Sequence, residues 1–95
     1  MATLSWSRGA ALDLQRLYRF LAKANPDAAS RAIETIKTSV DRLERFPEAG
    51  KPVGLEHPMY RDWIIPFGNA GYIARYRFDG EKVVILLVRH QRELL

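Results

Sequence analysis

The sequence predicts an α+β fold of the form βααβββ, in which a helical hairpin packs on one face of a mainly antiparallel sheet. Three observations predict it. Apolar residues recur at helical spacing between about residues 8 and 46, and at a period of two between about residues 60 and 90. The dipeptide Asp79-Gly80 interrupts the second region, as is typical of a hairpin turn. With 95 residues the chain is long enough for one domain, so we expect residues 1–95 to form a single unit.

Two helices are expected in the first region. Ser7 is a suitable N-cap for the first helix. Asn25 and Pro26 end it and start the second, because Asn caps helices and Pro is favoured at the first helical position. Pro47 ends the second helix. Their apolar stripes are Ala10, Leu14, Leu17, Tyr18 and Leu21 in the first helix, and Ala29, Ile33, Ile36, Val40 and Leu43 in the second.

Three strands are expected in the second region, at residues 60–65, 71–78 and 81–90, after a loop rich in Pro and Gly. Residues 3–6 are a weaker candidate for an N-terminal strand. A two-residue turn at Asp79-Gly80 would place Phe78 opposite Glu81, and this register sorts the side chains onto two faces. We expect the helices to cover the face made by Tyr72, Ala74, Tyr76, Val83, Ile85 and Leu87.

The other face mixes cationic and apolar side chains. It carries Ile73, Arg75, Arg77, Lys82, Val84, Leu86, Val88 and His90. Such a face is too charged for a dry core and too apolar for plain solvated surface, which is typical of a surface that meets a partner. Leu12 lies on the opposite side of the first helix from Leu14, together with Arg16 and Arg19. It is either one tolerated exposed leucine or part of a groove for an apolar, acidic peptide.

The amino-acid composition limits the kinds of ligand and partner that we expect this chain to bind. The net charge is +4, and 11 of the 15 basic residues are arginines, which suit carboxylates and phosphates alike. The chain has no cysteine, and His57 and His90 lie far apart, so no metal or other cofactor is expected. No segment is apolar enough to cross a bilayer and no secretory signal is present, so we expect a cytoplasmic protein without a membrane partner.

Catalytic motifs are missing from the sequence. No serine lies in a nucleophile-elbow pattern, and no glycine-rich phosphate loop occurs. His90 is the best single candidate for general acid–base catalysis, although a strand-end histidine that bonds to a backbone group is the favoured interpretation.

Several short motifs follow one another along almost the whole chain. They are Trp6, Ala11-x-Asp13-Leu14, Ala29-x-x-x-Ile33, Leu43-x-x-Phe46-Pro47-x-x-Gly50, Tyr60-Arg61, Gly71-Tyr72-x-x-x-Tyr76 and Val83-x-Ile85-Leu86-x-Val88-x-His90-x-Arg92. Their order and spacing resemble the RelE/ParE toxin superfamily of type II toxin–antitoxin modules. The resemblance implies the βααβββ fold and an antitoxin whose C-terminal segment wraps the toxin.

The superfamily has two functional branches. RelE-like members are ribosome-dependent mRNA endonucleases that commonly carry an arginine after the Gly-Tyr pair, where this chain has Ile73. A second basic residue of that branch aligns near Gln91, where Arg92 could substitute, and a tail tyrosine is absent. A neutral side chain cannot stabilise the charge that develops on the phosphorane. The chain is therefore more similar to the ParE branch, which implies binding to DNA gyrase, no catalytic residue and neutralisation by a ParD-type antitoxin.

Two alternatives remain open. One is a RelE-like ribonuclease with a rearranged site made of Arg61, Arg75, His90 and Arg92. The other is a module that has lost toxicity and only binds its antitoxin. For the ParE-like interpretation we assign target contacts to Arg61, His90 and Arg92, with nucleic acid met only through the antitoxin or gyrase. We assign antitoxin contacts to Leu12, Arg16, Arg19, Ile73, Arg75, Val84, Leu86, Val88 and Arg89.

Overall fold

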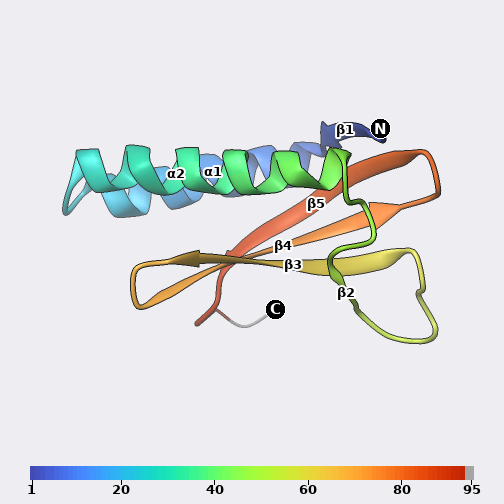
Figure 1. Ribbon diagram of the computed structural model, residues 1–95. Coiled ribbons are helices and arrows are strands. Elements are labelled where there is room, and N and C mark those ends of the chain that lie inside the picture. The colour runs from blue at the N-terminus through green and yellow to red at the C-terminus, as the bar shows by residue number, and fades with distance from the viewer. Residues whose placement is uncertain (94–95) are drawn as a thin grey trace.

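A computed structural model describes residues 1–93 of the chain. Two helices lie side by side on one face of a sheet (Figure 1), which confirms the predicted α+β architecture. The elements in chain order are β1 (Thr3–Trp6), α1 (Arg8–Ala22), α2 (Pro26–Asp41), the 3₁₀ turn η1 (Arg42–Glu44), β2 (Lys51–Pro52), β3 (Tyr60–Phe67), β4 (Ala70–Phe78) and β5 (Lys82–His90).

The sheet has the strand order β1-β5-β4-β3-β2. Only the β1–β5 pair is parallel, so the sheet is mainly antiparallel, as predicted. The two-residue strand β2 lies within the expected loop and was not predicted. Because β1 ends at Trp6, opposite Ile85, no strand among residues 1–93 lies beside the outer edge of β5 from Leu86 onward.

The helix ends follow the capping residues. The Ser7 hydroxyl accepts a hydrogen bond from the Ala10 amide at 3.1 Å, and Asn25 Oδ1 accepts one from the Ala28 amide at 3.1 Å. Each cap satisfies one of the amides that a helix N-terminus leaves without an intrahelical partner. The two N-caps expected from the sequence are therefore confirmed.

The core lies between the helical hairpin and the covered face of the sheet. Its largest fully buried side chain is Tyr76, whose hydroxyl donates to the Pro47 carbonyl at 2.7 Å and accepts from the Gly50 amide at 2.9 Å. At one side of the core, Trp63 Nε1 donates to Ser39 Oγ at 3.0 Å and joins β3 to α2. The remaining fully buried core residues include Ala32, Ile36, Val40, Leu43, Ala74, Val83, Ile85 and Val88.

The predicted register of the last hairpin is wrong. Phe78 pairs with Val83, not with Glu81, and residues 79–81 connect β4 to β5 instead of two residues. Asp79 Oδ1 accepts the amides of Glu81 at 2.9 Å and Lys82 at 2.8 Å, which stabilises this wider turn.

A β-bulge then changes the faces of β5. Tyr76 pairs with Ile85 but Arg75 pairs with Leu87, which leaves Leu86 as the additional residue. Beyond the bulge, Val88 lies opposite Ala74 and is completely buried under the helices, so it cannot be one of the antitoxin contacts assigned from the sequence. His90 is on the same covered face, opposite Tyr72, whereas Leu87 lies on the open face.

Candidate functional site

The open face of the sheet carries an ion pair at its centre. Arg75 donates from Nε to Asp62 Oδ1 at 2.8 Å and from Nη2 to Asp62 Oδ2 at 3.0 Å. Both side chains are partly buried, and the hydrogen bond to Asp62 raises the pKa of Arg75. This bidentate geometry uses the guanidinium fork that Arg75 would otherwise offer to an anionic ligand.

Apolar side chains lie around this ion pair. Ile64 is 50% exposed, and Ile73, Val84 and Leu87 are half-buried on the same face. The open face therefore has the mixed cationic and apolar character predicted from the sequence, with Leu87 in place of Val88.

Arg61 lies on the other face of the sheet. It pairs with Tyr76 in the β3–β4 register, and its Nη1 donates to the carbonyls of Glu48 and Gly50, each at 2.8 Å. The alternation of side chains along a strand places Arg61 and Arg75 on opposite faces. The structure thus does not bring together the four residues of the alternative ribonuclease site.

His90 packs against Tyr72 in an edge-to-face arrangement, with 5.4 Å between ring centroids and 86° between ring planes. Its Nδ1 accepts a hydrogen bond from the Arg92 amide at 3.2 Å. This is the strand-end histidine with a backbone partner that the sequence favoured. Arg61 of β3 pairs with Tyr76, and His90 of β5 pairs with Tyr72, so β4 lies between them. The expected target contacts Arg61 and His90 therefore do not form one cluster.

The outer edge of β5 is capped by side chains. Asp13 Oδ2 accepts the Val88 amide at 2.9 Å and lies 2.6 Å from Arg89 Nη1. Glu93 Oε1 accepts the His90 amide at 2.9 Å. These carboxylates accept backbone amides that a neighbouring strand would otherwise bind, and so they protect this edge of the sheet. No role was predicted for Asp13 from the sequence, although an acidic residue on the sheet-facing side of a basic helix could have indicated a contact with the sheet.

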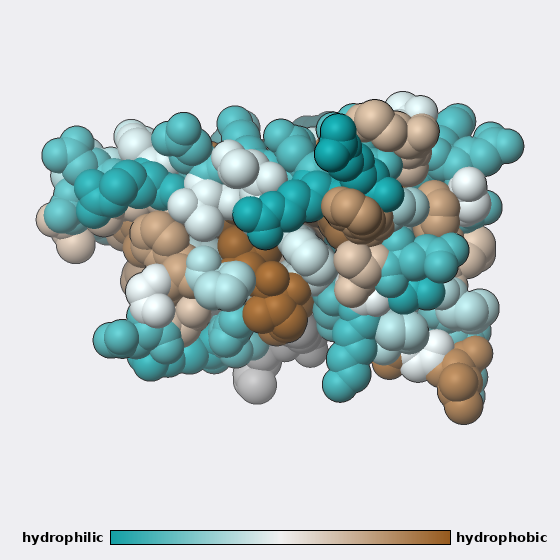
Figure 2. All heavy atoms as spheres, in the orientation of Figure 1, coloured by the Kyte–Doolittle hydropathy of each residue, from teal (hydrophilic) through white to brown (hydrophobic). Residues whose placement is uncertain are grey.

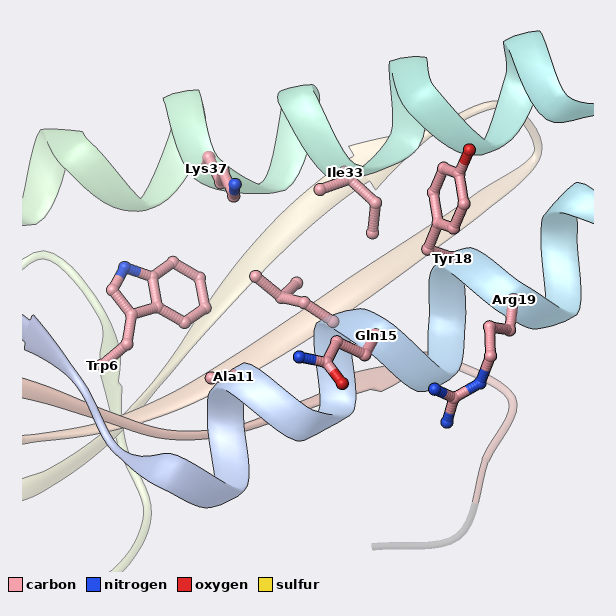
Figure 3. A pocket seen from close by; sticks show the side chains of 8 residues that line it. Trp6, Ala11, Gln15, Tyr18, Arg19, Ile33 and Lys37 are labelled. Atoms are coloured by element: carbon pink, nitrogen blue, oxygen red, sulfur yellow. The ribbon is translucent and has the colours of Figure 1, made fainter.

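A groove runs between the helices, and we call it the hairpin groove (Figure 3). Figure 3 shows Tyr18 of α1 and Ile33 of α2 pointing into it, with Trp6 at one end. The groove has a volume of about 610 Å³. Its lining is Trp6, Ala11, Leu14, Gln15, Tyr18, Arg19, Ile33 and Lys37.

A second hollow lies between the C-terminal half of α1 and the ends of β3, β4 and β5. We call it the tail pocket; its volume is about 570 Å³. Burial raises the pKa of Tyr72 in its wall, and the nearby Glu93 charge raises it further. Its apolar lining is Leu17, Phe20, Leu21, Phe67 and Tyr72, and its polar lining is Arg16, His90, Arg92 and Glu93.

The tail pocket and the hairpin groove each have one arginine of α1 in their lining. Arg16 lines the first and Arg19 lines the second, so the single outer face expected for Leu12, Arg16 and Arg19 is split. Leu12 itself is 50% exposed and belongs to neither lining. Figure 2 shows that apolar side chains reach the surface along the seam between the helices and the sheet.

Among residues 1–93, no group of three or more His, Asp or Glu side chains is placed to hold a metal ion. In the same part of the chain, no helix has the length and apolar character that a bilayer span requires.

Comparison with known proteins identifies the family. The family model described as "ParE toxin of type II toxin-antitoxin system, parDE" matches residues 4–95. The chain belongs to the ParE toxin family. Among solved structures, this ParE-family chain is similar to a chain of the chromosomal ParDE toxin–antitoxin system from P. aeruginosa, with 26% identity and a TM-score of 0.73 over 95% of this chain and 96% of the other.

Other relatives carry RelE names, as expected within a RelE/ParE superfamily. Toxin RelE1 from Caulobacter vibrioides is 35% identical over 85% of this ParE-family chain and 84% of the relative, and Toxin RelE3 from the same organism is 33% identical over 85% of each chain. A chain of the toxin–antitoxin complex RelBE2 from Mycobacterium tuberculosis has 27% identity and a TM-score of 0.61, over 95% of this chain and 98% of that one. The resemblance drawn from the sequence motifs is confirmed at the level of the superfamily, the fold and the toxin class.

Proposed function

We propose that this ParE-family toxin acts on DNA gyrase by binding, without chemistry of its own, in the cytoplasm. The observation that carries the proposal is the state of two arginines of the alternative ribonuclease site. Arg61 and Arg75 lie on opposite faces, and each is bound to partners within the chain. A metal-independent ribonuclease instead needs several basic groups aimed at one phosphate to stabilise the charge of the transition state.

We further propose a ParD-type antitoxin as the partner that neutralises the toxin. The match to the parDE family model and the similarity to a ParDE structure support this choice. The antitoxin would contact the open face through Ile73, Arg75, Val84 and Arg89, the bulge through Leu86, and α1 through Leu12 and Arg19. An acidic and apolar segment complements this surface, given the net charge of +4.

The direct test is a supercoiling assay with purified gyrase and the antitoxin-free toxin. We expect supercoiling to be inhibited and double-strand DNA cleavage to accumulate, and gyrase overexpression to relieve growth arrest in cells. A toxin supplemented with an excess of antitoxin is the matched control. Undisturbed gyrase would contradict the proposal.

The RelE names of two relatives favour the second candidate function, a ribosome-dependent mRNA endonuclease. The same preparation added to a translating extract distinguishes the two, because a ribonuclease would cut mRNA on the ribosome and leave gyrase active. Activity in neither assay, with antitoxin binding retained, would identify a non-toxic antitoxin-binding module. In the ribonuclease case, Arg61→Gln and Arg75→Gln should each remove the cleavage.

A further inference from the structure

The tail pocket combines an apolar interior with an arginine, Arg16, whose hydrogen bonds are only partly satisfied. Of the residues in its lining, the sequence predicted contacts only for Arg16, His90 and Arg92. Phe20 at its rim is 70% exposed, although Leu17 beside it is buried. A large exposed aromatic side chain next to an apolar hollow is the arrangement found where an interface places its anchor residue.

Arg16 supplies the second observation. Its Nη1 lies 3.2 Å from Glu93 Oε2, but its Nη2 is buried and has no hydrogen-bond partner among residues 1–93. A buried donor without an acceptor is costly, and native structures seldom leave one without a water, a ligand or a partner that satisfies it. The rest of the polar rim holds one further cation, the exposed Arg92, beside His90 and the Glu93 carboxylate that pairs with Arg16.

The chemistry of the occupant follows from these two features. The apolar lining favours a large aliphatic or aromatic side chain as the ligand group, and the volume of about 570 Å³ is sufficient for one or more of them. The Arg16 side chain, which is 42% exposed, and the exposed Arg92 favour a carboxylate next to that side chain. An acidic, apolar peptide segment offers both groups within a few residues, and a neutral or basic segment does not.

We propose that the tail pocket anchors the antitoxin: a large apolar side chain of its toxin-binding segment enters between Phe20, Leu17 and Tyr72, and a neighbouring carboxylate binds Arg16 and Arg92. The proposal rests on the proposed function for the existence of this partner. It adds a binding site on the helical side of the sheet, away from the open face.

The experiment uses the full-length toxin and the product of the reading frame immediately adjacent to its gene, titrated by calorimetry. Phe20→Ala and Arg16→Gln should each raise the dissociation constant by about tenfold or more, the level that marks an interface anchor. Phe46→Ala is the matched control for Phe20, because Phe46 is 62% exposed and lies outside the pocket lining. Arg31→Gln is the control for Arg16, since Arg31 is an exposed arginine on α2. Both controls should stay within about twofold of wild type.

A charge cycle tests the carboxylate directly. Each Asp and Glu of the peptide that spans the toxin-binding segment is neutralised in turn, against wild-type toxin and against Arg16→Gln. One acidic position should weaken binding to the wild type about tenfold and have no further effect on Arg16→Gln, because coupled groups are non-additive. Far-UV circular dichroism and thermal melting show that the variants remain folded.

Three outcomes separate the possibilities. If the adjacent product fails to bind wild-type toxin, the antitoxin assignment fails and the pocket proposal fails with it. If it binds, and Arg75→Gln weakens it while Phe20→Ala and Arg16→Gln do not, the partner uses the open face and only the pocket proposal is overturned. If Phe20→Ala changes sedimentation of the free toxin but not antitoxin affinity, a second copy of this chain occupies the pocket and the proposal is likewise overturned.

Discussion

Asp13 of α1 and Val88 of β5 are 75 residues apart in the sequence, yet the Asp13 carboxylate accepts the Val88 backbone amide at 2.9 Å. The same oxygen lies 2.6 Å from Arg89 Nη1. The Asp13 side chain is only 14% exposed, so the bond is largely shielded from water. One helical side chain therefore takes the place of a strand at the edge of the sheet and fixes α1 against β5.

Asp13→Ala should lower the free energy of unfolding by about 1–3 kcal/mol, because the Val88 amide loses its acceptor and Arg89 loses its ion-pair partner. Urea denaturation followed by circular dichroism measures the change. Glu34→Ala is the matched control, since Glu34 is an exposed acid on α2. Equal stability of the two variants would show that water replaces the carboxylate at the edge.

Tyr76→Phe should cost a similar amount, about 1–3 kcal/mol, for a different reason. The ring still fills the core, but the Gly50 amide and the Pro47 carbonyl lose the hydroxyl that satisfies both of them. Thermal unfolding by calorimetry provides the measurement. Tyr18→Phe, at an exposed tyrosine, should leave the midpoint unchanged, and the same result for Tyr76→Phe would refute the importance of this hydroxyl.

Gly50→Ala tests how closely the loop before β2 packs on the core. A Cβ at position 50 would lie 2.6 Å from both Cε1 and the hydroxyl oxygen of Tyr76. Because Tyr76 is completely buried, relief of this clash requires a shift of the ring or the loop, and we expect a loss of about 1–3 kcal/mol. Gly54→Ala is the control, since a Cβ there meets nothing within 4 Å. Chemical denaturation of the two variants side by side gives the comparison, and equal midpoints would contradict the expected clash.

Stability should fall in alkali because of two tyrosines. Burial raises the pKa of Tyr72 and Tyr76 above the ordinary value of 10.0, since the phenolate is poorly solvated in the core. The folded chain then holds these protons more tightly than the unfolded chain, so their contribution is complete below about pH 10 and is lost as the pH rises through the folded pKa. Denaturation between neutral and strongly alkaline pH measures this loss.

Tyr72→Phe removes one of the two groups and should flatten the alkaline loss. Tyr18→Phe should retain the wild-type pH dependence. An unchanged profile in Tyr72→Phe would mean that this tyrosine does not couple folding to pH.

Much of the fold was predictable because its signals are local. The two N-caps, the break at Asn25-Pro26 and the change from helical to strand periodicity all depend on residues close together in the chain. These signals located α1, β3, β4, β5 and the start of α2 to within a few residues. The predicted end of α2 at Pro47 is wrong, because α2 ends at Asp41 and the 3₁₀ turn η1 follows it. The short strand β2 was missed because two residues carry no periodicity.

The register of β4 against β5 was not predictable from Asp79-Gly80 alone. That dipeptide fits a two-residue turn, but the Asp79 carboxylate instead accepts two successive amides and stabilises a three-residue connection. The bulge at Leu86 then moves Val88 into the core and Leu87 onto the open face. Both Val and Leu suit either face of a half-buried strand, so composition offered no correction.

The candidate site, like the fold, was predictable from the sequence only in part. Composition and spacing predicted that the open face would mix arginines with apolar residues, and the structure agrees. The pairing of Arg75 with Asp62, the use of Arg61 on the far face and the separation of Arg16 from Arg19 depend on strand neighbours and on helix rotation. The tail pocket joins α1 to strand ends about 50 to 75 residues away in the chain.

The sequence by itself determined the order and type of the elements, the superfamily and the cationic character of the chain, because helix caps, periodicity and charge are properties of neighbouring residues. Tertiary structure alone decided which arginines are engaged by acids and carbonyls, which face Val88 occupies and where the hollows lie. Those outcomes arise from contacts between distant segments, whose geometry one extra residue in a strand can reverse.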